Sequence, residues 1–111
     1  DLRTDPRFNG IIFRLVGAAD YESVAALDAG IARVLAAHPA QVIVDASGLE
    51  FLNSGAIGRL VELRKRVMAT GGQVAIAGAT RYVAECFRLS RLDHAFTMHA
   101  TVDAAINTLA G

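Results

Sequence analysis

The sequence predicts a single α/β domain with a mixed, mostly parallel β-sheet of about five strands and about four helices. Short β-branched, apolar segments alternate with segments whose apolar residues recur at helical spacing, as in parallel strands joined by right-handed crossovers. The 111 residues, of which 53% are hydrophobic, are enough for one core. We therefore expect one domain over residues 1–111, in the element order ββαβαβαβα.

The first two strands are expected to form a hairpin at one edge of the sheet. Residues 2–8 contain Pro6, which lacks a backbone N–H and therefore favours an edge strand. Gly10 supplies a turn, and residues 11–16 are a β-branched and aromatic run that is typical of a strand. Antiparallel pairing of these two segments makes the sheet mixed.

The first helix follows polar residues that can cap its start. Asp20 or Ser23 can accept a hydrogen bond from the first helical turn. Pro39 ends the helix, because proline disfavours helical geometry in the residue before it. The face that should be buried carries Val24, Leu27, Ile31, Val34 and Leu35.

A central strand and a second helix follow. Residues 42–44 are continuously apolar and β-branched, which is typical of a strand covered on both faces. A turn then leads into a helix from Ser54 to about Thr70, where a glycine pair supplies a left-handed stop. Arg64 interrupts the buried stripe, and we expect its aliphatic part along the core and its guanidinium in water. The stripe should consist of Ile57, Leu60, Val61, Val67 and Met68.

The last two strands are predicted over residues 74–77 and 95–98. Each precedes a helix with a threonine at its start, Thr80 for the third helix and Thr101 for the fourth. The buried residues of these two helices should be Val83, Cys86 and Phe87, and then Val102, Ala105, Ile106 and Leu109.

Charge and cysteine content narrow the class of protein. The 11 basic and 11 acidic side chains balance, which argues against electrostatic binding to nucleic acid or an anionic membrane. No apolar run approaches the roughly 20 residues of a spanning helix, so we expect no direct membrane insertion. Cys86 has no second cysteine with which to pair, which favours a reducing, cytoplasmic location.

The sequence lacks the motifs and residue spacings that catalysis or metal binding would need. No phosphate-binding glycine loop occurs, and no histidine can be assigned to Ser54 as a base. His38, His94 and His99 lack ligand spacing and are expected to be surface or loop residues. Cys86, on a buried helix face, is expected to be inert. The sequence therefore predicts a protein that is not an enzyme and needs no metal or other cofactor.

The junction before the second helix places one hydroxyl, that of Ser54, at a helix start. A helix N-terminus carries partial positive charge and favours a phosphate, so Ser54 is a candidate phosphorylation switch. Serine is also a preferred helix N-cap, so a structural role stays open, although Asn53 could take the cap instead. Asp45 and Ser47 are expected to bond to nearby N–H groups in the preceding turn.

The segment around this junction resembles the phosphorylatable turn of STAS domains, which include anti-sigma-factor antagonists and modules of sulphate transporters. The similar pattern is Asp45-x-Ser47-Gly48-Leu49-x-Phe51-Leu52-Asn53-Ser54-Gly55-Ala56-Ile57-Gly58-x-Leu60. Gly17-x-x-Asp20 and Gly71-Gly72-x-Val74 are also similar to that family. The resemblance covers essentially the whole chain in the order of its elements.

The resemblance implies a function. In bacterial antagonists of this type, an anti-sigma factor that is also a serine kinase, of the histidine-kinase-like ATPase type, phosphorylates a serine at this helix start. The unmodified antagonist binds the kinase, and the phosphorylated form releases it. Ser54 is the implied acceptor. Asn53, Gly55 and Ala56 replace the acidic residue, the Ser or Thr and the glycine that are common at their positions.

A partner-binding surface is also expected along the outer face of the second helix, which carries Arg59, Glu62 and Arg66, with Leu63 at an exposed border. The expected contact residues are Asp20, Asn53, Ser54, Gly55, Gly58, Arg59, Glu62 and Leu63. A helix cap at Asp20 and a merely solvated charged face are the structural alternatives. Two functional alternatives stay open: a constitutive scaffold of a transporter, phospholipid-trafficking or stress-sensing assembly without serine phosphorylation, and a nucleotide-binding domain.

Overall fold

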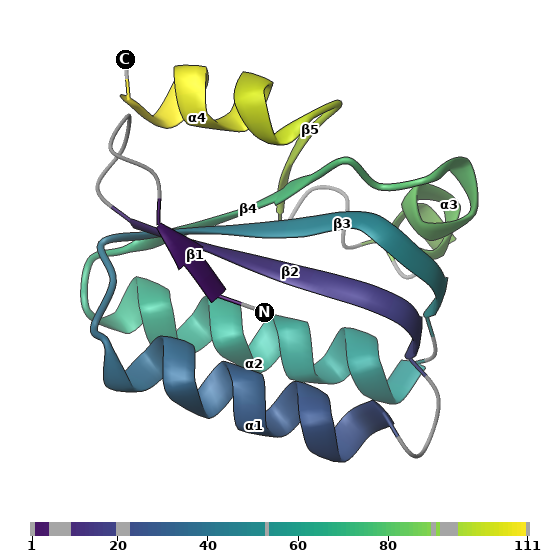
Figure 1. Cartoon of the computed structure of the whole chain (residues 1–111), viewed down its shortest axis with the longest axis horizontal. Helices are drawn as coiled ribbons and strands as arrows, with labels where there is room; N and C mark the ends of the chain where they lie inside the picture. Colours follow the sequence, from purple (N-terminus) through teal and green to yellow (C-terminus); the bar gives the residue numbers. More distant parts are fainter. Residues whose placement is uncertain are drawn as a thin grey trace.

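The structure of the protein, a computed structural model, describes residues 2–4, 10–19, 23–52, 54–89, 91 and 96–110. At its centre lies a five-stranded sheet in the order β1-β2-β3-β4-β5. β1 pairs antiparallel with β2, and the other neighbouring strands are parallel (Figure 1). This confirms the predicted mixed, mostly parallel sheet. The strands are β1 (Leu2–Thr4), β2 (Gly10–Ala19), β3 (Gln41–Leu52), β4 (Gln73–Ala77) and β5 (Thr97–His99).

Helices cover both faces of the sheet, and the element order is the predicted one. α1 and α2 lie side by side on one face, whereas α4 lies on the opposite face (Figure 1). α3 contacts β3. The helices of the described residues are α1 (Ser23–Ala36), α2 (Ser54–Ala69), α3 (Arg81–Leu89) and α4 (Val102–Ala110).

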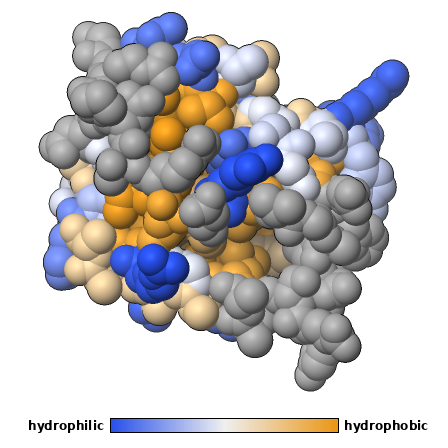
Figure 2. All heavy atoms as spheres, in the orientation of Figure 1, coloured by the Kyte–Doolittle hydropathy of each residue, from blue (hydrophilic) through white to orange (hydrophobic). Residues whose placement is uncertain are grey.

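Side chains of the sheet alternate between two hydrophobic clusters, as the pleat of a strand requires. In β3, Val42 and Val44 belong to the main cluster with α1 and α2, while Ile43 joins Ile106 of α4 in a smaller one. Apolar side chains also reach the surface on the face seen in Figure 1, beside hydrophilic ones (Figure 2). The main core thus lies between the sheet and the α1–α2 pair.

β3 is longer than the sequence predicts. We expected a strand over residues 42–44 followed by a turn, whereas β3 comprises Gln41–Leu52. β2 is also longer than expected, and it pairs with β3 up to Leu52 through register shifts. Such irregularities let a strand accommodate turn-forming residues such as Ser47 and Gly48. Pairing with β2 therefore overrides the local preference for a turn.

The predicted helix ends are confirmed where their residues are described. The Thr80 hydroxyl accepts a hydrogen bond from the Val83 N–H at 3.3 Å, and the Thr101 hydroxyl accepts one from the Ala104 N–H at 3.0 Å. Gly71, just after α2, has a φ of 84°, the left-handed conformation expected of a glycine stop.

The buried face of α2 differs from the prediction at two positions. Leu63 was expected at an exposed border, but it is 0% exposed and belongs to the main core. Met68 was expected in the core, but it is 48% exposed. Ala56, Leu60, Leu63 and Val67 recur at helical spacing and are all buried, so the buried stripe is centred on them. The charges that flank Leu63 suggested a surface position that the packing does not support.

Candidate functional site

The candidate site is centred on the junction between β3 and α2. β3 ends at Leu52, and α2 begins at Ser54. Asp20 and Asn53, two of the expected contact residues, lie outside the described residues. The backbone therefore confirms that Ser54 is the first residue of a helix, while the outward orientation of its hydroxyl stays a prediction.

The start of α2 packs into the main core. Ala56 and Ile57 of its first turn are buried in the main core. No acidic side chain is present in that turn. A phosphate on Ser54 would therefore meet the positive end of the helix without a like charge from the same turn.

Arg59 links the outer face of α2 to α1. Its Nε donates to Asp28 Oδ1 at 3.0 Å, and its Nη1 donates to the Gly55 carbonyl oxygen at 3.3 Å. Sequence reasoning missed Asp28, because nothing local to α1 marks it as the partner of a residue on the next helix. Two of the expected contact residues, Gly55 and Arg59, are thus in direct contact through a hydrogen bond.

Glu62 and Arg66 continue the charged face of α2 toward its end. Arg66 Nε donates to Glu62 Oε1 at 3.1 Å, and both side chains are largely exposed. Exposed ion pairs of this kind contribute little to stability, so both groups are free to exchange partners. Leu63, in contrast, is removed from the candidate surface by its burial in the core.

Gly58 is an exposed glycine within a helix, with no packing reason for it among the described residues. A Cβ placed there would meet nothing within 4 Å. Gly30 of α1 is different, because a Cβ there would lie 2.7 Å from Phe13 Cζ. Close packing therefore explains Gly30 but leaves Gly58 available for the close approach of a partner.

Asp45 organises the β3 segment that leads to the junction. It is 4% exposed, and its Oδ1 accepts hydrogen bonds from the Ser47 N–H at 3.0 Å and from the Ser47 hydroxyl at 2.6 Å. Arg14 Nε lies 3.9 Å from Asp45 Oδ2. The expected bond of Asp45 to a nearby N–H is confirmed, whereas the Ser47 hydroxyl donates to Asp45. The burial of Asp45 gives it a structural role in positioning this segment.

The histidines do not form a metal site within the described part of the chain, where no group of three or more candidate ligands occurs. His38 follows α1 and is exposed, as expected. His99 corrects the prediction of a surface or loop residue, because it lies in β5 with its Nε2 buried and without a hydrogen-bond partner. His94 lies outside the described residues.

The same described residues contain no helix that is both long and apolar enough to cross a membrane. This geometry defines a class of α/β domain. In it, one helix begins at a position set by core packing and presents a charged outer face. The chain belongs to the STAS domain family, which matches residues 1–105.

Solved structures share the fold. An anti-sigma factor antagonist from Mycobacterium paratuberculosis is 23% identical, with a TM-score of 0.84, and the match covers 99% of this chain and 92% of that one. The anti-sigma factor antagonist SpoIIAA in its unphosphorylated form is also 23% identical, with a TM-score of 0.79 and coverage of 97% and 93%.

A sulfate transporter family protein from Wolinella succinogenes is similar in fold as well. It is 13% identical, with a TM-score of 0.79, and the match covers 96% of this chain and 88% of that one. The comparison with curated proteins gave no match. At these identities the solved structures establish the fold, which is shared by antagonists and by a transporter protein.

Proposed function

We propose that the protein is an anti-sigma-factor antagonist whose binding to an anti-sigma factor kinase is controlled by phosphorylation of Ser54. The observation that carries the proposal is the start of α2 at Ser54, in a first turn that contains no acidic side chain. Membership of the STAS family supports it, because domains of that family are generally non-enzymatic binding modules. The relative SpoIIAA is an antagonist described by its phosphorylation state, which supports the same mechanism.

The proposed mechanism is electrostatic. A phosphate adds about −1.5 to −2 charges at neutral pH. At the start of α2, this charge is tolerated by the free domain because the helix dipole favours it. Within a protein interface the same charge loses its water, and without a matching cation it opposes binding. The partner is thus released without any change in the fold of the domain.

Ser54→Asp is expected to weaken binding of the kinase by about tenfold or more, which corresponds to at least about 1.4 kcal/mol. Ser54→Ala should bind as the unmodified chain does, because it adds neither charge nor bulk. Calorimetric titration of a histidine-kinase-like anti-sigma factor with the three proteins measures this difference. Incubation with the kinase and ATP, followed by mass spectrometry, should place one phosphate on Ser54. Equal affinities of the Asp and Ala variants would contradict the switch.

Gly58→Ala should separate stability from binding. Since the added Cβ meets nothing within 4 Å, the substitution should stabilise the domain by about 0.5–1 kcal/mol, the usual difference between alanine and glycine in a helix. Kinase binding should nevertheless weaken, because the methyl group would prevent close approach at this position. Thermal unfolding and titration measure the two effects. Unchanged affinity in the stabilised variant would remove Gly58 from the interface.

A constitutive scaffold is the second candidate function, and the likeness to a sulfate transporter family protein favours it. The substitutions at Asn53, Gly55 and Ala56 relative to the common antagonist turn support it as well. A scaffold would keep its partner regardless of phosphorylation. The absence of phosphate on Ser54 after treatment with the kinase, together with retained binding by Ser54→Asp, would favour this function over the switch.

A further inference from the structure

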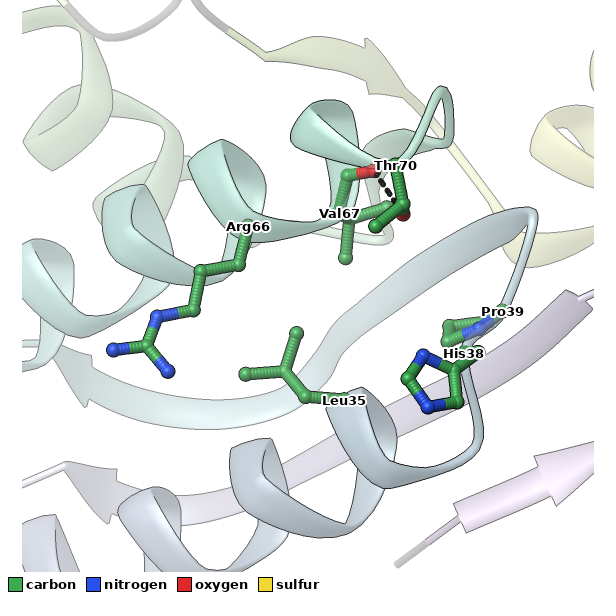
Figure 3. A pocket seen from close by; sticks show the side chains of 6 residues that line it. All are labelled: Leu35, His38, Pro39, Arg66, Val67 and Thr70. Carbon is green, nitrogen blue, oxygen red and sulfur yellow. Dashed lines mark hydrogen bonds between the residues drawn. The ribbon is translucent and has the colours of Figure 1, made fainter.

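We draw no further inference here: the strongest candidate, the hollow between the ends of α1 and α2 that is lined by Leu35, Arg66 and Val67 (Figure 3), carries nothing because nothing in the structure shows what covers it.

Discussion

Leu63→Ala is expected to lower the free energy of unfolding by about 2–5 kcal/mol, the usual range for a fully buried leucine. Leu63 is wholly inaccessible to solvent and lies in the main core with Leu60 and Val67 of the same helix. The substitution removes one methine carbon and two methyl carbons, so it loses their favourable transfer energy and leaves a cavity between α2 and the sheet. Urea unfolding, with the same slope for both proteins, measures the difference.

Leu89→Ala is the control for this substitution. Leu89 is the same residue type, also in a helix, but is 70% exposed. Its truncation should change the unfolding free energy by no more than about 0.5 kcal/mol. If the two substitutions had equal effects, the burial of Leu63 would be wrong, and its place on a partner-binding surface would have to be reconsidered.

Asp45→Ala should destabilise the domain by about 2 kcal/mol, the second large effect. The substitution removes the acceptor for the N–H and hydroxyl of Ser47, and the charge that faces Arg14. Arg14 and Ser47 are exposed and can recover water, so we expect less than the 3–5 kcal/mol typical of a wholly buried ion pair. Thermal and urea unfolding measure the loss.

Asp45→Asn separates the hydrogen bonds to Ser47 from the charge that faces Arg14. The amide oxygen can still accept from Ser47 at the position of Oδ1, whereas the charge opposite Arg14 is lost. Most of the stability should therefore return in the asparagine variant, because the bonds to Ser47 are the short ones. A loss as large as that of Asp45→Ala would assign the main contribution to Arg14 instead.

Strong local signals explain why most elements could be predicted. A threonine that bonds the first turn of its own helix, as Thr80 and Thr101 do, is encoded within a few residues. The left-handed stop at Gly71 depends on one residue type in the same way. Local chemistry of this kind is visible in the sequence because the partners are adjacent in the chain.

Signals that depend on distant partners were harder to interpret. The length of β3 depends on its pairing with β2, so Ser47 and Gly48 suggested a turn that the sheet does not form. The buried face of α2 depends on what covers it, so the charges beside Leu63 suggested exposure. Both errors arise because a local pattern was used at positions where contacts with distant residues determine which conformation has the lower free energy.

The same distinction between local signals and distant contacts applies to the candidate site. Sequence patterns predict the fold class, the order of elements and the position of Ser54 at a helix start, because periodicity and capping are properties of short segments. Packing of α1 against α2 brings Asp28 to Arg59 and places Leu35 and Val67 beside the same hollow. Those pairs come from two helices whose relative placement is fixed by packing on a shared sheet, and no local pattern encodes which side chains then meet.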